Sequence, residues 1–524
     1  MLHHAIKASF FKISLLKATV GGLLLVGCVT QTVAQAEDAS TWVKKGEAAL
    51  AAAKRLTPNN KHAKNVILFV GDGMGISTIT AARIFEGQTK GIDGESNQLS
   101  FEKLPYVALS KTYSANQQTA DSAPTMTAIV TGVKTNDGIL SLNQSVLGDE
   151  EDNAKVQAAK LTTILELAEK RGLSTGVIST ARLTHATPAA TYAHTSNRDW
   201  EDNQQVPTGS QVKDIAAQLI DNFVGKTSGN GLEVALGGGR TNFLPNTLTD
   251  PEYTALKGRR TDGRNLVEEF KQKFNAQYVW NSAQFNAIDP KKTQRLLGLF
   301  EPSHMQYAHD RSKDGAGEPS LTEMTEKAID ILAKNKKGYF LMVEAGRIDH
   351  AHHAGNAYRA LSDAVALSDA VKRALEKVDL DNTLVIVTAD HSHTFTIAGY
   401  PVRGNPILGK VINPGNADFA KASDGKPYTT LSYGNGAGFH EDHTEENQVN
   451  AEQPLVPRSG RVQDLTAIDT TNPNYHQEAT VPLKSETHGA EDVAIFSGGP
   501  KAHLLQGAQE QSYIFYVMKD ALGL

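Results

Sequence analysis

Four short apolar runs, separated by amphipathic segments, constrain the fold of this chain more than any other feature. The runs are Asn65–Val70, Thr175–Ser179, Gly338–Val343 and Thr383–Thr388. Apolar runs of this length without polar alternation are typical of strands that are buried on both faces. Segments between them, such as Lys155–Arg171 and Leu321–Asn335, have the spacing of helices with one apolar face. We therefore predict an α/β fold with a mainly parallel central sheet and helices on both of its faces.

The composition describes a globular protein and excludes some classes of site. The chain has 524 residues, of which 40% are hydrophobic and 21% are charged, and a formal net charge of −6. This mild acidity argues against a nucleic-acid-binding surface. The chain has one cysteine, Cys28, which excludes an internal disulfide and a zinc site built from several thiolates. Any metal ligands must come from the histidines and the carboxylates.

The first 36 residues have the pattern of an export signal. Residues 1–17 include lysines but no acidic residue, and the uncharged run Ala18–Gly27 follows them. That run is too short to span a membrane. Two cleavage sites compete: Ala34-Gln35-Ala36 fits ordinary signal peptidase, and Leu25-Val26-Gly27-Cys28 resembles the lipobox of bacterial lipoproteins. The position of the single cysteine favours lipidation. We expect an exported protein that is periplasmic, anchored to the outer membrane through Cys28, or secreted.

Carboxylate or imidazole side chains follow each of the four runs. In chain order these candidate ligands are Asp72, then His185, then Glu344, Asp349, His350 and His353, then Asp390, His391 and His393, with His488 further on. In an open α/β sheet, ligands bind beyond the carboxyl ends of the strands. Single pairs of this kind are usually structural. Four such clusters at one end of a sheet favour a metal centre.

The residue types indicate which ions would bind. Asp349 and His353 are four residues apart and share one face if a helix begins there. Carboxylates with imidazoles and no thiolate suit zinc with an open coordination position, and magnesium beside it. Ser122 precedes an apolar, helix-like segment and is a candidate nucleophile, because amide groups at a helix N-terminus can hold an anion. The alternative that Ser122 only caps a helix stays open.

With these features the chain resembles the alkaline phosphatases over essentially all of the mature sequence. The motifs that carry the resemblance are DGMG (72–75), TADSAPTMT (119–127), THATPAATYAHTSNR (184–198), VEAGRIDHAHH (343–353), TADHSH (388–393) and ETHGAEDVAIF (486–496). The resemblance implies a catalytic domain over 37–524. It also implies that the irregular stretch 394–481 is an insertion that forms crown or interface loops.

The resemblance also implies roles for individual residues. Ser122 becomes the phosphoserine, and Arg198 grips two phosphate oxygens, as a planar guanidinium can. The ligands implied for the metals are Asp349, His353 and His488 for a first zinc, Asp72, Asp390 and His391 for a second zinc, and Asp72, Thr187 and Glu344 for magnesium. His185, His350 and His393 are expected to support these groups without being primary ligands.

The implied reaction is the hydrolysis of phosphate monoesters with a broad substrate range. Ser122 attacks phosphorus in line, and water then cleaves the phosphoserine and releases inorganic phosphate. Phe300-Glu301-Pro302, with Glu318 downstream, resembles part of an extra calcium site in the animal enzymes. A homodimer is expected, with contacts from the insertion.

Other functions compete with this one. A sulfatase would need an arginine where Met126 stands. Related phosphodiesterases typically use threonine as the nucleophile, and cofactor-independent phosphoglycerate mutases need a sugar-acid pocket. A phosphate-binding lipoprotein without catalysis would need neither the nucleophile nor three metal sets.

Overall fold

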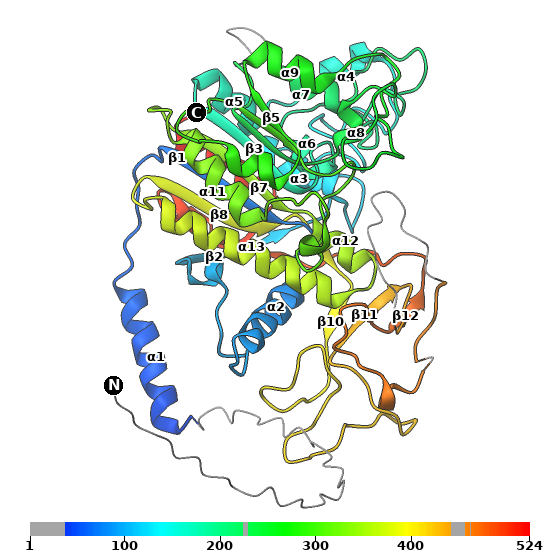
Figure 1. Cartoon of the computed structure of the whole chain (residues 1–524). Coiled ribbons are helices and arrows are strands. Elements are labelled where there is room, and N and C mark those ends of the chain that lie inside the picture. The colour runs from blue at the N-terminus through cyan, green and yellow to red at the C-terminus, as the bar shows by residue number, and fades with distance from the viewer. Residues whose placement is uncertain (1–36, 224–228, 442–455, 462) are drawn as a thin grey trace, which may run out of the picture.

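The computed structural model in Figure 1 describes residues 37–223, 229–441, 456–461 and 463–524. The predicted signal peptide, both cleavage sites and Cys28 lie outside these residues. In the described part of the chain, no helix is both long enough and apolar enough to cross a bilayer.

The centre of the molecule is a sheet with ten strands among the described residues, in the order β15-β2-β14-β8-β1-β7-β3-β4-β6-β5. Neighbouring strands from β8 to β5 are parallel, and β14 is antiparallel to both β8 and β2. The bounds are β1 Asn65–Gly71, β2 Tyr106–Lys111, β3 Ser174–Arg182, β4 Val234–Gly238, β5 Gln277–Val279, β6 Leu296–Leu299, β7 Tyr339–Ala345, β8 Thr383–Ala389, β14 Val493–Gly498 and β15 Gly507–Glu510. The predicted fold class is confirmed, and each of the four apolar runs forms a strand, although Gly338 lies just before β7.

The unbroken apolar character of β1 follows from its place inside the sheet. Val66, Leu68 and Val70 pack into the core on one face of the sheet, whereas Ile67 and Phe69 pack into the core on the other. Successive side chains of a strand point to opposite faces, so a strand covered on both faces needs apolar residues at every position.

Helices cover both faces. Those on the first face are α3 Ser122–Thr131, α5 Ile164–Arg171, α6 Ala186–Ala189, α7 Ile215–Asp221, α8 Arg240–Phe243, α9 Leu266–Phe274 and α14 Tyr513–Leu522. Those on the second face are α2 Ile76–Thr89, η1 Ser100–Lys103, α10 Ser282–Ala287, α11 Leu321–Leu332, α12 Arg347–His353 and α13 Ala357–Lys377. The remaining helical segments are α1 Ala39–Lys54, α4 Asn153–Ala159, η2 Arg311–Lys313, η3 Leu465–Ala467 and η4 Ala502–Leu504.

The prediction of one helix over Lys155–Arg171 is wrong, because the segment forms two helices, α4 and α5. The second begins at Ile164 and is capped by Thr163, whose hydroxyl accepts a hydrogen bond from the Glu166 amide while the Glu166 carboxylate accepts one from the Thr163 amide. The break leaves the first amide groups of α5 without carbonyls of a preceding turn, and this capping box supplies side-chain acceptors to two amides there.

The segment between β8 and β14 contributes two smaller sheets. A two-stranded sheet pairs β9 Ser392–His393 with β13 His488–Gly489, which brings candidate ligands from distant parts of the chain together. A three-stranded sheet has the order β10-β11-β12, with bounds Phe395–Ile397, Leu431–Gly436 and Ala479–Pro482. In Figure 1 this sheet and its long loops lie beside the ends of α2 and α12.

Candidate active site

The predicted ligands meet at one edge of the central sheet. Asp72 follows β1, Glu344 lies in β7, and Asp390 and His391 follow β8. Asp349 lies in α12, which begins two residues after β7 ends. All five side chains are buried. Parallel strands bring their carboxyl ends to the same edge, so residues that are hundreds of positions apart become neighbours.

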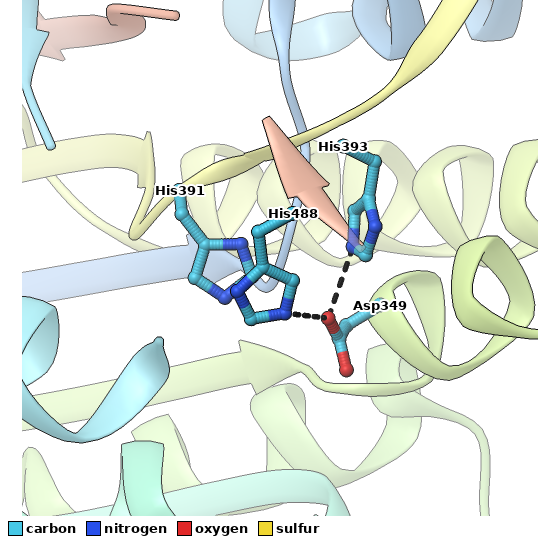
Figure 2. A group of neighbouring side chains, drawn as sticks. All are labelled: Asp349, His391, His393 and His488. Carbon is cyan, nitrogen blue, oxygen red and sulfur yellow. Dashed lines mark hydrogen bonds and ion pairs between the residues drawn. The ribbon is translucent and has the colours of Figure 1, made fainter. Parts of the chain in front are cut away.

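One group of ligands surrounds the Asp349 carboxylate. Its Oδ1 lies 3.3 Å from His353 Nε2, 3.3 Å from His488 Nε2 and 2.9 Å from His393 Nε2. Figure 2 shows His488 and His393 approaching the same oxygen from two sides, with His391 behind His488. The candidate ligand atoms of Asp349, His391, His393 and His488 all lie within 4.8 Å of one another. One carboxylate and several imidazoles at this spacing fit zinc.

Glu486 holds this group in place, and sequence reasoning assigned it no role. Its carboxylate oxygen Oε2 lies 2.5 Å from His393 Nδ1, and its backbone carbonyl lies 2.6 Å from His353 Nδ1. Histidine ligands are typically oriented by a carbonyl or carboxylate on the second ring nitrogen. The signal available in the sequence was its position two residues before His488.

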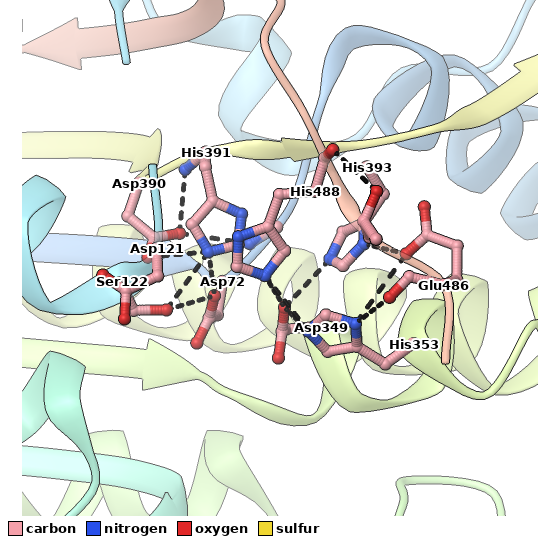
Figure 3. A network of polar contacts seen from close by, with 12 residues as sticks. Asp72, Asp121, Ser122, Asp349, His353, Asp390, His391, His393, Glu486 and His488 are labelled. Carbon is pink, nitrogen blue, oxygen red and sulfur yellow. Dashed lines mark hydrogen bonds and ion pairs between the residues drawn. The ribbon is translucent and has the colours of Figure 1, made fainter. Parts of the chain in front are cut away.

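A second group lies beside the first, around Asp72, Asp390 and His391. His391 Nε2 lies 3.3 Å from Asp72 Oδ1 and 3.4 Å from Asp390 Oδ2. The ring of His391 stacks on that of His488, with centroids 3.6 Å apart, and so joins the two groups. Figure 3 shows both groups as one network of polar contacts.

Ser122 points into the second group. Its Oγ lies 3.1 Å from His391 Nε2 and 3.3 Å from Asp72 Oδ1. Ser122 is the first residue of α3, and the cap of this helix is Asp121, whose Oδ1 accepts a hydrogen bond from the Ala123 amide. Because Asp121 already caps the helix, the open alternative that Ser122 is only the cap does not describe this structure. Its hydroxyl therefore faces carboxylate and imidazole groups at a helix N-terminus.

A third group lies on the other side of Asp72. Carboxylate oxygens of Asp72 and Glu344 and a ring nitrogen of His185 lie within 4.8 Å of one another. Thr187 Oγ1 is 3.5 Å from Asp72 Oδ2. Ser179 Oγ donates a hydrogen bond to Glu344 Oε2, and Glu344 Oε1 is buried without a hydrogen-bond partner in the described residues. A buried, unpaired carboxylate oxygen beside a second carboxylate fits a bound cation.

Arg198 lies between Asp121 and His185. Its Nη1 donates a 2.7 Å hydrogen bond to Asp121 Oδ2, and its Nη2 lies 3.0 Å from His185 Nε2. The His350 ring lies 5.4 Å from the His185 ring. His304, which sequence reasoning did not single out, lies 4.1 Å from the His350 ring, so the three rings form one cluster. Nothing in the sequence around His304 marks it as part of this site.

The charges of these groups depend strongly on one another. Burial, together with the Asp72 carboxylate, raises the pKa of Glu344 well above its ordinary value. Burial and Asp72 also raise the pKa of Asp390 to about 6. For His391, burial acts to lower the pKa, but Asp390 and Asp72 outweigh it and raise the pKa to about 10. Carboxylates that repel one another in a buried site are typical of metal centres, where a cation compensates their charge.

A separate acidic cluster lies away from these groups. Ligand oxygens of Glu252, Glu301 and Asp314 lie within 4.8 Å of one another. Buried oxygens of Glu301, Asp314 and Glu318 have no hydrogen-bond partner in the described residues. Burial raises the pKa of Glu301 to about 8. Of this cluster, the sequence pattern indicated Glu301 and Glu318, whereas Glu252 and Asp314 come from loops without a recognisable motif.

Comparison with known proteins agrees with this geometry. The family model "Alkaline phosphatase" matches residues 63–524. The chain is 42% identical over 513 residues to the tissue-nonspecific alkaline phosphatase of Felis catus, covering 95% of this chain and 92% of that protein. It is also 42% identical over 474 residues to an alkaline phosphatase of Gadus morhua, covering 89% of this chain and 93% of that protein.

The fold agrees with a solved structure as well. The Thermus thermophilus alkaline phosphatase superposes with a TM-score of 0.63 at 24% identity, covering 90% of this chain and 94% of that one. At that identity the likeness supports the fold alone, whereas the family model and the 42% identical relatives cover the site as well. The chain therefore belongs to the alkaline phosphatase family and is a metal-dependent phosphomonoesterase.

Proposed function

We propose that this chain hydrolyses a broad range of phosphate monoesters through a phosphoserine at Ser122, with inorganic phosphate as product. The observation that carries the proposal is the setting of the Ser122 hydroxyl. Its Oγ lies within 3.3 Å of both His391 Nε2 and Asp72 Oδ1, at the N-terminus of a ten-residue helix. A hydroxyl in this position can be deprotonated and can attack phosphorus while helix amides face the phosphate oxygens.

We assign the first zinc to Asp349, His353 and His488, and the second to Asp72, Asp390 and His391. Both sets are supported by buried carboxylates within 3.4 Å of imidazole nitrogens. Zinc ions bound there would supply positive charge that lowers the pKa of a hydroxyl or of water and stabilises a leaving oxygen. We assign magnesium to Asp72, Thr187 and Glu344, and the unpaired Glu344 Oε1 supports a cation there.

The remaining steps belong to side chains of this chain. Arg198 orients the phosphate by donating from its guanidinium, which Asp121 holds at 2.7 Å. His185, His350 and His393 support these groups from behind, since His185 contacts Arg198 and His393 contacts Asp349. The alcohol leaves on the side opposite Ser122, as an in-line displacement requires.

A calcium ion at the acidic cluster is a further part of the proposal. The cluster brings together Glu252, Glu301 and Asp314, and Glu318 lies beside it. Several buried carboxylate oxygens without partners suit a hard cation with oxygen ligands.

We also propose that the protein is exported and works as a homodimer. Export, and anchoring through a lipidated Cys28, rest on the sequence of residues 1–36. The dimer rests on the family resemblance, and apolar side chains that a partner could cover are exposed on α1, at Trp42, Val43 and Leu50, and in the insertion at Tyr400, which is 85% exposed. The molecular mass in solution measures the dimer directly.

Trapping of the covalent intermediate tests the function. Wild-type protein loaded with zinc and magnesium should turn over p-nitrophenyl phosphate at alkaline pH, and should carry radiolabelled phosphoserine after an acid quench. Ser122→Ala should lose the label and keep nearly all of its zinc, because the serine oxygen is at most one ligand of one ion. Label on another residue, or no label in the wild type, would contradict the proposal.

A further inference from the structure

His352 is a buried histidine next to the first metal site that belongs to none of the ligand sets. Its side chain is fully buried, and both ring nitrogens are engaged. Nε2 lies 2.9 Å from the Thr78 hydroxyl of α2, and Nδ1 lies 2.8 Å from the Tyr433 hydroxyl of β11. The imidazole therefore connects the helix that follows β1 with a strand of the 394–481 segment.

The ring of His352 also supports the ring of His393. The two centroids are 4.7 Å apart and the planes are inclined by 33°. The Phe395 ring packs on His352 as well, at 4.9 Å, and Tyr433 packs on Phe395 at 5.2 Å. His393 in turn contacts Asp349 Oδ1 at 2.9 Å. A displacement of His352 would thus be transmitted through one ring to the carboxylate of the first metal site.

The position of His352 in its helix adds a second route to the same site. It lies in α12 between Asp349 and His353, which we assign as ligands. A helix of seven residues has little stability of its own, so its orientation depends on tertiary contacts. Because the two hydrogen bonds of His352 reach other elements, they constrain the rotation of α12 about its axis. That rotation determines the direction in which the Asp349 and His353 side chains point.

A purely space-filling role does not account for these contacts. Burying an imidazole costs free energy unless its nitrogens are hydrogen-bonded, and an apolar ring of similar size would fill the same space without that cost. Both ring nitrogens of His352 instead form hydrogen bonds, each with a hydroxyl group from a different element.

We propose that His352 is a positioning residue of the first metal site. Its bonds to Thr78 and Tyr433 set the orientation of α12 and of the His393–Asp349 pair, and make strand β11 part of the scaffold of the metal centre. This inference rests on the assignment of the first zinc to Asp349, His353 and His488.

The test is the rate at which zinc leaves the folded enzyme, followed with a chromogenic chelator. His352→Phe keeps a ring in the aromatic cluster but removes both hydrogen bonds, and Tyr433→Phe removes one hydroxyl. His194→Phe is the matched control, because His194 is also buried, with Nδ1 2.9 Å from the Ser141 carbonyl and Nε2 3.0 Å from Glu166. It touches no assigned ligand in the described contacts. The visible absorption of cobalt in the first site reports its geometry independently of activity.

We expect His352→Phe to release one zinc about tenfold faster than wild type or more, as loss of groups that orient metal ligands typically causes. Tyr433→Phe should release it several-fold faster, which keeps the test available if His352→Phe does not fold. The cobalt spectrum should change in both variants and stay unchanged in His194→Phe. Zinc release within twofold of the His194→Phe rate in both variants would overturn the proposal.

One further variant tests the assignment of the first zinc site separately from the role of His352. Asp349→Ala should lose the first zinc outright, whereas the His352 variants should bind it and release it faster. If Asp349→Ala retains the zinc content of the wild type, the assignment of the site falls, and the role of His352 with it. If Asp349→Ala loses zinc while the His352 and Tyr433 variants do not differ from wild type, the proposed function stands and this inference alone is wrong.

Discussion

Replacing Gly73 by alanine should damage both the stability of the protein and its first metal site. Gly73 follows Asp72 directly and has φ +69°, a left-handed conformation that costs an alanine about 1–2 kcal/mol. A Cβ at this position would overlap His393 Nε2 and lie 2.5 Å from His393 Cδ2. The imidazole would have to move away and lose its contact with Asp349, and a hydrogen bond to a charged group is worth about 1.5–3 kcal/mol.

Gly91 provides the matched control for this substitution. It has φ +76°, and a Cβ built on it would meet no atom within 4 Å. Gly91→Ala therefore carries the backbone strain alone and should cost about 1–2 kcal/mol without loss of activity. The difference between the two variants isolates the displacement of His393. We expect Gly73→Ala to be less stable than Gly91→Ala by about 1.5–3 kcal/mol.

Urea unfolding followed by tryptophan fluorescence measures the stability difference, and zinc content with kcat/KM measures the damage to the site. In a second comparison, His393→Ala removes the side chain that the new Cβ would overlap. Adding Gly73→Ala to His393→Ala should therefore lower the free energy of unfolding by less than Gly73→Ala does in the wild type. Equal stability and equal activity of Gly73→Ala and Gly91→Ala would refute the argument, because the contact with His393 would then carry no energetic weight.

Three further outcomes are expected. Arg198→Ala should weaken inhibition by inorganic phosphate and lower kcat/KM roughly 10-fold or more, since each charged hydrogen bond is worth about 1.5–3 kcal/mol; unchanged phosphate inhibition would exclude Arg198 as the phosphate clamp. Burial and the nearby Glu169 raise the pKa of Glu233 from an ordinary value of 4.5 to about 7. Because the folded-state pKa is the higher one, stability is lost as pH rises from 4.5 to about 7, and the urea midpoint of Glu233→Gln should fall less over that range than that of the wild type. Cys28→Ser should move the enzyme from the detergent phase to the aqueous phase, or leave the precursor uncleaved, without changing kcat; a mature N-terminus at Glu37 in the wild type would rule out lipidation.

The central strands and the candidate ligands that directly follow them could be predicted from the sequence, because both depend on local patterns. A strand that is covered on both faces must be apolar at every position. The run around Phe69 can therefore be recognised as such a strand from its own sequence, without knowing which strands lie beside it. Parallel strands also present their carboxyl ends at one edge, and the sequence order alone therefore predicts that Asp72, Asp349 and Asp390 approach one another.

Contacts between segments that share no local pattern were decided only by the tertiary structure. Glu486 contacts His393 across 93 positions because β9 and β13 pair, and the sequence contains no signal for that pairing. His304 joins the cluster with His350 because a loop after β6 approaches α12, and His352 reaches Tyr433 because β11 packs beside that helix. The periodicity of apolar residues indicates only which face of its own helix or strand a residue lies on. Which elements become neighbours depends on the packing of the whole chain, and these supporting contacts arise there.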